Sequence, residues 1–543
     1  MEKTVADALV DALVNWGVEF IFGKRGSGLV SILDSLNQRR NQIQLIEVKN
    51  EEAASLMACG YARFTGKVGV CFGSAGSGGI RLLDGLYDAK LDGQPVLALT
   101  GAPPFDTGGM FGQQDVPLEL LFMDVAAFST RVTSPDQVEN STNQAFRAAL
   151  GQHGVAHITI PVDIQAKPVK RGNTSVMAAQ SISGLFAQRA RLPYEGDLRQ
   201  AAEILNTGKR VVIIAGKGAL GASAELDIVA GILAAPIIKA LQGKAVLPDD
   251  NPYTTGVLGP LGTEPSKQAI NNCDTLLMVG TSFPYTEYLP VQGTVRAVQI
   301  DNDPTRIGLR YLIEVGLVGD SQRTLKELLP KLEHKMDRSW LEEIQGEMGK
   351  WRAEVETEGS SKSGRLAPQM VAWELGKILP EDAVLACDSG NVTGWWAKYI
   401  DTKEGQMHAV SGNLSVPGSS LPYAIAAQAA FPNRVCAAFT GDSEISVLLT
   451  EFATCVRYGL PVKIVILNHG VSKESLLRPD LQGDEAYIES TAETTYTIRT
   501  DFAAFARSYG AAGFTVKDPS ELCPALEAAF ANQTPAIIDC HVL

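Results

Sequence analysis

The sequence predicts an α/β fold of three doubly wound parallel-sheet domains, and three observations support this prediction. Short apolar runs such as "KVGVCFG" and "PVLALTG" alternate with helical patterns along the chain, which is typical of parallel strands joined by crossover helices. Two polar stretches, 166–183 and 334–364, interrupt the alternation. The 543 residues also exceed what one hydrophobic core usually supports. We therefore expect three domains, at residues 1–168, 190–335 and 362–543.

The first domain is expected to begin with a capped helix, because Thr4 precedes Asp7 at the spacing of a helix cap. The apolar residues on one face of this helix are Val5, Leu9, Leu13 and Trp16. Strands are then predicted in "EFIFG", "IQLIEV", "KVGVCFG", "PVLALTG" and "AHITIPVD".

The other two domains repeat the same alternation. In the second domain, strands are predicted in "RVVIIAG", "TLLMVGT" and "VRAVQID". In the third domain, they are predicted in "AVLACD", "VCAAFTGD", "VKIVIL" and "PAIIDC". The stretch 166–183 is interpreted as a linker, and 334–364 as a partly helical connection.

Composition excludes several classes of function. The formal charge is 47 − 61 = −14, so a general affinity for nucleic acid or an anionic membrane is not expected. The sequence contains no signal-peptide pattern and no apolar stretch of about 18 residues, so export and membrane insertion are not expected either. The eight cysteines are scattered without a CxxC motif, which favours buried thiols in a reducing cytoplasm.

A first candidate site lies in the third domain. Gly441, Asp442 and Ser443 follow one predicted strand, and His469 ends the next. Because the carboxyl ends of parallel strands meet at one edge of a sheet, these residues should converge on a crevice. A carboxylate there suits a hard divalent cation, and a following helix start suits phosphate. The alternative is a tight turn with an N-capping aspartate.

A second candidate site lies in the first domain. Glu51 opens a helix directly after a strand, and the glycine-rich "GSAGSGG" (73–79) follows the next strand. Glycines allow a backbone to approach a ligand closely. The alternative for Glu51 is a carboxylate that only interacts with the helix dipole.

Together with "FGQQDVPLELLF", "NPYTTGVLG", "GTSFPYTEYLP" and "VQIDNDPTRIG", these segments resemble the thiamine-diphosphate-dependent enzymes of the pyruvate oxidase and acetolactate synthase group. The resemblance spans nearly the whole chain and is closest to pyruvate oxidase and pyruvate:quinone dehydrogenase. It implies a pyrimidine-binding, a central and a diphosphate-binding domain. It also implies thiamine diphosphate with Mg²⁺ or Mn²⁺, and a site formed between the first domain of one subunit and the third domain of another. At least a homodimer, and usually a homotetramer, is therefore expected.

The implied reaction is decarboxylation of a 2-oxo acid, with transfer of the resulting enamine to flavin or another acceptor. Two alternatives stay open. One is an acetolactate synthase-like carboligase, and the other is a catalytically silent homologue that serves as a binding subunit.

Site residues are carried over by matching motifs. Glu51 matches the glutamate that hydrogen-bonds the aminopyrimidine and promotes ylide formation, and Gln113 matches an active-site glutamine. Asp442, His469 and the main-chain carbonyl of Val471 take the positions of the metal ligands. The other positions in matching cofactor segments are Ser415, Val416, Pro417, Gly441, Ser443, Glu444 and Gly470.

Two of these positions depart from the family pattern. His469 stands where the family has a metal-ligating asparagine, and imidazole favours softer ions than Mg²⁺. His469 could ligate the metal, Asn468 or water could replace it, or the metal site could be lost. Pro417 stands where a large apolar wedge usually bends the cofactor, so neighbouring residues would have to support that bend.

Four basic residues indicate a substrate that is more anionic or larger than pyruvate. Lys24 and Arg25 lie in a first-domain loop, Arg81 follows the glycine-rich loop, and Arg478 replaces an active-site acid. The alternative is that each is a solvated surface cation.

The second domain is expected to bind FAD. Its "GKGALG" (216–221) matches G-x-G-x-x-G, which alone is weak evidence for a dinucleotide. The positions that match flavin-binding segments of the family are Leu258, Gly259, Pro260, Leu261, Thr281, Ser282, Phe283, Pro284, Tyr285 and Asp301. The alternative is a purely structural domain.

Overall fold

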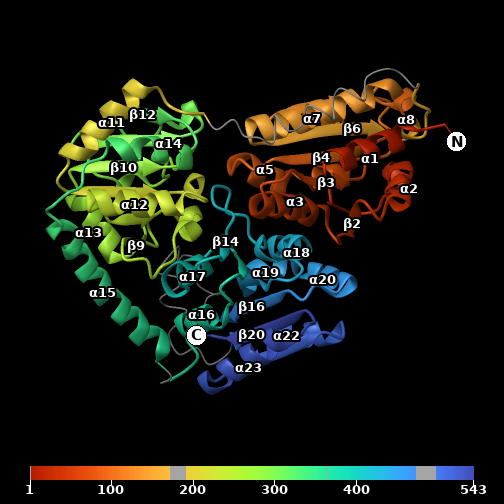
Figure 1. Cartoon of the computed structure of the whole chain (residues 1–543). Helices are drawn as coiled ribbons and strands as arrows, with labels where there is room; N and C mark the ends of the chain where they lie inside the picture. Colours follow the sequence, from red (N-terminus) through yellow and green to blue (C-terminus); the bar gives the residue numbers. More distant parts are fainter. Residues whose placement is uncertain (1, 171–190, 362–363, 473–496, 543) are drawn as a thin grey trace.

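A computed structural model describes residues 2–170, 191–361, 364–472 and 497–542, which fold around three six-stranded parallel sheets (Figure 1). Each sheet carries helices on its faces, as the alternation of apolar runs and helical patterns predicted. The linker predicted at 166–183 lies largely outside the described residues.

The first sheet has the order β2-β1-β3-β4-β6-β5. Its strands are β1 (Phe20–Gly23), β2 (Gln44–Glu47), β3 (Gly69–Gly73), β4 (Val96–Ala102), β5 (Ala126–Arg131) and β6 (Val155–Pro161). Its helices are α1 (Val5–Asn15), α2 (Val30–Gln38), α3 (Glu51–Thr65), α4 (Ser77–Ile80), α5 (Leu83–Leu91), α6 (Leu118–Leu121), α7 (Val138–Gln152) and α8 (Val162–Gln165). Thr4 and Asp7 form the expected capping box, which satisfies free N–H groups at the start of α1.

The second sheet has the order β12-β11-β10-β7-β8-β9. Its strands are β7 (Val211–Ala215), β8 (Ile237–Lys239), β9 (Thr254–Val257), β10 (Thr275–Val279), β11 (Arg296–Asp301) and β12 (Val315–Val318). Its helices are α11 (Glu195–Thr207), α12 (Ser223–Leu233), α13 (Glu264–Asn272) and α14 (Ser321–Leu328). The connection predicted to be partly helical contains α15 (Ser339–Ser360), which runs from the second sheet to the third (Figure 1).

The third sheet has the order β14-β13-β15-β16-β20-β19. Its strands are β13 (Val384–Cys387), β14 (Met407–Ala409), β15 (Cys436–Gly441), β16 (Lys463–Asn468), β19 (Ala512–Val516) and β20 (Ala536–His541), and β17 (Val471–Ser472) pairs with β18 (Thr497–Ile498) outside it. Its helices are α16 (Pro368–Ile378), α17 (Val392–Tyr399), α18 (Ser420–Ala430), α19 (Asp442–Leu448), α20 (Phe452–Tyr458), α22 (Phe502–Ser508) and α23 (Pro519–Ala531).

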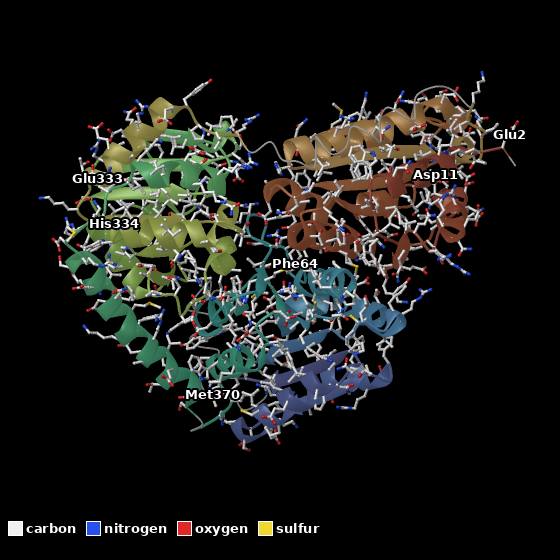
Figure 2. The ribbon with its side chains drawn as sticks, viewed as in Figure 1. Glu2, Asp11, Phe64, Glu333, His334 and Met370 are labelled. Carbon is white, nitrogen blue, oxygen red and sulfur yellow. The ribbon has the colours of Figure 1, made fainter. Side chains whose placement is uncertain are left out.

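The first and third domains share one apolar core. Helix α3 packs against α18, and a Cβ on Gly60 would lie 2.9 Å from the Cα of Tyr423, so the two helices cross too closely for a larger residue at that position. Phe64, near the end of α3, lies where the two domains meet (Figure 2). Among the described helices, none has both the length and the apolar character needed to span a bilayer.

Candidate functional site

The structure places Asp442 and His469 side by side at the carboxyl ends of β15 and β16. Asp442 is the first residue of α19, and its Oδ2 accepts a hydrogen bond from the Gly470 N–H at 3.0 Å. His469 Nδ1 lies 4.0 Å from Asp442 Oδ1. Burial lowers the pKa of His469, although Asp442 acts in the opposite direction, so the imidazole is neutral near pH 7. A carboxylate and a neutral imidazole are suitable donors for a divalent metal.

Asn468 does not take part in this pair. Its side chain is fully buried, and Nδ2 donates to the Thr500 carbonyl at 2.9 Å and to Asp539 Oδ1 at 2.8 Å. Val471 follows in β17, and its main-chain carbonyl is the third predicted ligand. Among the described residues, no three His, Cys, Asp or Glu side chains converge on one metal position. Asp442 and His469 are therefore the two side chains present that fit a metal here.

Asp388, which is not among the predicted site residues, holds together the loops around this pair. This buried carboxylate follows β13 and accepts hydrogen bonds from the Gly418 N–H at 2.8 Å, Ser420 Oγ at 2.7 Å and Thr440 Oγ1 at 3.0 Å. Burial raises its pKa to about 6. The acidic residue directly after the apolar run "AVLAC" is the signal that could have revealed it.

Beside Asp442, two glycines without side chains make room for another group, and the Glu444 carboxylate occupies that room in this structure. A Cβ on Gly390 (φ +92°) would lie 2.4 Å from Glu444 Oε1, and one on Gly441 would lie 2.2 Å from Oε2. Burial and the charge of Asp442 raise the pKa of Glu444. The backbone fits a phosphate group at this point, but a diphosphate and this carboxylate cannot occupy the same space. The site therefore fits the cofactor with the Glu444 side chain turned away.

The loop that contains Pro417 lies next to these glycines. Ser415 has a φ of +58°, and its carbonyl accepts a hydrogen bond from Ser389 Oγ at 3.1 Å. Val416 is buried and donates its N–H to Ser411 Oγ at 2.9 Å, whereas Pro417 is exposed. Val416 rather than Pro417 is therefore the apolar side chain that packs into this loop.

Glu51 is the first residue of α3 and is 5% exposed. Its Oε2 is buried and accepts no hydrogen bond from the described residues, and Arg81 Nη1 lies 3.7 Å from it. A Cβ on Gly78 would lie 3.1 Å from Oε1, so the carboxylate faces the glycine-rich loop. A buried acceptor without a donor is rare in folded proteins, and it fits a ligand that supplies an N–H group.

Other described residues predicted for the first-domain site are more exposed to solvent than Glu51. Gln113 and Gln114 are both exposed, and Gln114 (φ +63°) lies over the glycine-rich loop, with its Cα 3.0 Å from a Cβ built on Gly76. Arg25 pairs with Glu47 at 3.1 Å, and Lys24 is partly exposed. Arg478 lies outside the described residues.

In the central domain, two of the segments predicted to bind flavin lie together. A Cβ on Gly259 (φ +114°) would lie 3.3 Å from Tyr285 Cδ2 and 3.7 Å from Phe283 Cζ. Asp301 ends β11, which pairs with β10 just before Thr281, and burial raises the pKa of Asp301. Of the remaining positions, Leu258 is buried, Ser282 is half-buried, and Pro260, Leu261 and Pro284 are exposed. These segments therefore lie at the carboxyl ends of β9, β10 and β11, where open α/β sheets bind ligands.

The glycines of "GKGALG" allow close packing of two strand-end loops. The Gly218 N–H donates to the Gly280 carbonyl at 3.0 Å, and a Cβ on Gly218 would lie 2.8 Å from the Gly280 Cα. Lys217 points to the first domain and donates to the Asp92 carbonyl, and burial lowers its pKa to about 8.

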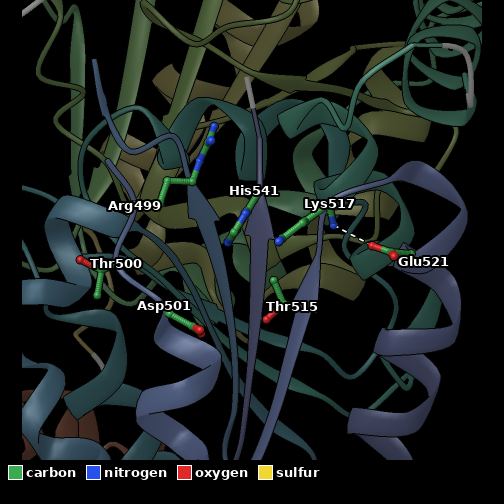
Figure 3. A pocket seen from close by; sticks show the side chains of 7 residues that line it. All are labelled: Arg499, Thr500, Asp501, Thr515, Lys517, Glu521 and His541. Atoms are coloured by element: carbon green, nitrogen blue, oxygen red, sulfur yellow. Dashed lines mark hydrogen bonds between the residues drawn. The ribbon is translucent and has the colours of Figure 1, made fainter. Parts of the chain in front are cut away.

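A cavity of about 360 Å³ lies at the carboxyl ends of β19 and β20, on the side of β16 away from β15 (Figure 3). Arg499, Lys517 and His541 line it together with acidic and hydroxyl side chains. Arg499 Nε also donates to the Asn468 carbonyl at 3.2 Å, which connects this cavity to the strand that carries His469. None of the predicted site residues is among the residues that line the cavity.

Three family models match the chain in the order of its sheets. They are the N-terminal TPP binding domain (residues 3–120), the central domain (198–328) and the C-terminal TPP binding domain (388–540) of thiamine pyrophosphate enzymes. A Bacillus subtilis (strain 168) relative, named "Putative thiamine pyrophosphate-containing protein YdaP", is 37% identical over 99% of this chain and 91% of its own length. The chain belongs to the thiamine pyrophosphate enzyme family. The family resemblance and the fold predicted from sequence are thus confirmed.

Two further relatives of this thiamine pyrophosphate enzyme have named activities. The pyruvate oxidase of Lactiplantibacillus plantarum is 29% identical over 85% of this chain and 76% of its own length. The acetolactate synthase large subunit of Parasynechococcus marenigrum is 30% identical over 99% of this chain and 87% of its own length. This family member therefore has relatives of both reaction types.

Proposed function

We propose that the chain is a thiamine diphosphate- and metal-dependent enzyme that decarboxylates a 2-oxo acid and passes the remaining acyl unit, with its electron pair, to an acceptor. The observation that carries this proposal is the buried Glu51 carboxylate, whose Oε2 lacks a donor among the described residues and which faces a glycine-rich loop. When bound, thiamine diphosphate supplies a carbon nucleophile that adds to the ketone and accepts the electrons left by CO₂.

In this proposal, each residue of the site has a separate task. Glu51 Oε2 holds the proton that is exchanged with the cofactor's pyrimidine ring. Asp442, His469 and the Val471 carbonyl hold the metal, which neutralises the diphosphate. Arg81, 3.7 Å from Glu51 and 57% exposed, is available to an anionic group on the substrate, which supports an acid larger or more charged than pyruvate.

We also propose that the central domain binds FAD, which would accept the electrons in a pyruvate oxidase-like reaction. The closeness of the segments at Gly259 and Tyr285 supports this assignment, because a nucleotide could then bind both segments at once. Carboligation is the second candidate, since the acetolactate synthase relative is as similar as the pyruvate oxidase. Carboligation would yield a new carbon–carbon bond without bleaching a flavin band during anaerobic turnover.

We propose that the working enzyme is at least a homodimer, and by family analogy a homotetramer. The described structure exposes apolar side chains around the first-domain site, with exposed fractions of 99% for Phe111, 72% for Met110, 67% for Met123 and 60% for Leu120. A monomer rarely leaves such a group of apolar side chains in water, which supports cover by the third domain of a second subunit.

The test of this function is Glu51→Gln. Turnover of a panel of 2-oxo acids should fall by about 10²–10⁴, the range for a group that transfers protons, because the amide cannot donate and regain a proton. Circular dichroism should stay unchanged, which separates loss of chemistry from loss of fold. If the variant turns over at the wild-type rate, Glu51 does not have the proposed role.

A further inference from the structure

The loop that leads into Glu51 is held by the third domain of the same chain. Glu451 Oε1 accepts hydrogen bonds from the Lys49 and Asn50 N–H groups, both at 2.8 Å. Glu451 is fully buried, and Thr454 Oγ1 donates to its Oε2 at 2.8 Å, which fixes the carboxylate in place. The two amides that it binds are those immediately before Glu51.

A second group of contacts holds the same loop. The Glu47 N–H donates to Tyr458 Oη at 2.8 Å, and Arg457 Nη2 lies 2.9 Å from Glu47 Oε2. Tyr458 and Arg457 belong to α20, which begins directly after Glu451. The third domain thus supplies the acceptors for three of the four backbone N–H groups between residues 47 and 50.

These contacts restrict the position of the Glu51 carboxylate. Two charge-assisted hydrogen bonds to successive amides fix both the path of the loop and the start of α3, where Glu51 is the first residue. Proton transfer needs heavy atoms within about 2.6–3.2 Å of each other, and a displacement of about 1 Å can cost a hundredfold in rate. Movement of this loop would therefore act directly on the chemistry of Glu51.

The hydrogen bonds of Glu451 are explained less well by a role that only joins the first and third domains. The α3–α18 crossing at Gly60 and the shared apolar core already join the two domains. A buried carboxylate is costly to desolvate, and burial raises the pKa of Glu451 against the effect of its hydrogen-bond donors. An apolar residue would join the domains at lower cost, whereas only an acceptor can hold these two amides.

We propose that Glu451 is a positioning residue that holds Glu51 in the geometry for proton transfer, and that Tyr458 supports the same loop through the Glu47 N–H. This inference rests on the proposed function, because it assigns Glu451 a role through Glu51. In the proposed dimer, each third domain then serves two sites. Its metal pair at the start of α19 contributes to the site shared with the second subunit, and its Glu451 positions Glu51 of its own chain.

The first experiment measures amide hydrogen exchange in the apoprotein and needs no cofactor. Glu451→Ala should lose protection at Lys49 and Asn50, and Glu451→Gln should lose part of it because a neutral amide oxygen still accepts. Asp249→Asn is the matched control, since Asp249 is also a buried carboxylate that accepts a backbone N–H across a domain junction, from Thr402 at 2.8 Å. The control should keep residues 49 and 50 protected.

The second experiment follows exchange of the thiazolium proton of bound thiamine diphosphate by NMR. Glu451→Ala should slow this exchange by about ten- to a hundredfold, because losing a hydrogen bond to a charged group changes an equilibrium by about that factor. Glu451→Gln and Tyr458→Phe should slow it less. Asp249→Asn should leave the rate unchanged even if it lowers the unfolding temperature.

The outcomes separate the two proposals. If Glu51→Gln slows this exchange and the Glu451 variants do not, the positioning role is wrong and the proposed function stands. If the Glu451 variants keep residues 49 and 50 protected, the contact itself is wrong. If Glu51→Gln exchanges as fast as the wild type, the proposed function fails, whatever the Glu451 variants do.

Discussion

At the scale of single residues, Glu444 is the side chain that most directly opposes the proposed cofactor. Its carboxylate lies against Gly390 and Gly441, where the backbone leaves room for a phosphate group. Two like charges about 4 Å apart repel by about 4 kcal/mol at the effective dielectric of a protein surface, and a bound divalent metal reduces this repulsion. The side chain must therefore move before a diphosphate binds.

Replacing Glu444 with glutamine should strengthen binding of thiamine diphosphate by at least about tenfold, because the repulsion is removed while side-chain size is kept. Calorimetric titration in the presence of Mn²⁺ measures this change. Glu527→Gln, at an exposed position on α23 of the same domain, makes the same change in net charge and should have no effect. Equal affinities for wild type and Glu444→Gln would show that the charge of Glu444 does not oppose cofactor binding.

A second prediction at the residue scale concerns which metal ion His469 favours. With imidazole nitrogen beside Asp442, the site should prefer Mn²⁺, Co²⁺ or Zn²⁺ over Mg²⁺, since nitrogen donors favour these ions. His469→Asn should shift the preference to Mg²⁺, because an amide oxygen is a harder donor. Cofactor titrations with each metal in turn check this. An identical order of metals in wild type and variant would exclude His469 as a ligand.

At the scale of strands, β6 contributes a buried histidine that makes the first domain sensitive to acid. His157 contacts Thr100 Oγ1 at 2.8 Å and Ser129 Oγ at 2.9 Å, and it stacks on Phe122. Burial lowers its pKa from 6.5 to about 3. The unfolded chain therefore binds this proton more tightly, so stability present at neutral pH is lost as the pH falls below about 6.5.

His157→Gln should remove this part of the pH dependence. Between pH 6.5 and 4.5, the wild type should lose about 2 kcal/mol more of its unfolding free energy than the variant, because the unfolded histidine is already half protonated at pH 6.5. Urea unfolding followed by tryptophan fluorescence at both pH values gives the difference. Parallel pH profiles for the two proteins would mean that folding does not lower the pKa of His157.

The strands that could be predicted from sequence are those with long apolar runs. Every predicted strand is present, whereas β5, β8, β9, β12, β14 and β19 and the short pair β17 and β18 were not anticipated. Most of these lie at or next to a sheet edge and are short or only partly buried, as in "MHA" of β14 and the partly exposed "AGFTV" of β19. Edge strands need fewer apolar residues, so their pattern resembles that of loops.

In the candidate site, too, some residues could be predicted from sequence and others could not. Asp442 and His469 could be predicted to meet because each follows a strand, and neighbouring parallel strands end together. Asp388 could have been noticed from its place after a strand, but the roles of Asp388 and Glu451 could not be assigned, because their partners are set by tertiary contacts. Glu451 and Lys49, for example, are 402 residues apart in sequence. The position of the Glu444 carboxylate also depends on two glycines far apart in sequence, Gly390 after β13 and Gly441 at the end of β15.

At the scale of the whole molecule, Asp92 connects all three domains. This buried carboxylate accepts hydrogen bonds from Arg63 of the first domain at 2.6 Å, Gln242 of the central domain at 2.9 Å and Asn413 of the third at 2.6 Å. The positive charge of Arg63 holds the pKa of Asp92 well below its usual value. Each domain that carries part of the proposed site is therefore fixed relative to the other two.

The central claim is that this assembly binds thiamine diphosphate through a metal at Asp442. The measurement that tests it most directly is calorimetric titration of metal-free protein with thiamine diphosphate, with and without Mn²⁺ or Mg²⁺. The wild type should bind only with metal, and Asp442→Ala should weaken binding by more than about a hundredfold, since outer partners of a metal alone are worth about 10–100-fold. Binding that is equally tight without metal or in Asp442→Ala, or no binding with any metal, would contradict the account and favour a silent homologue.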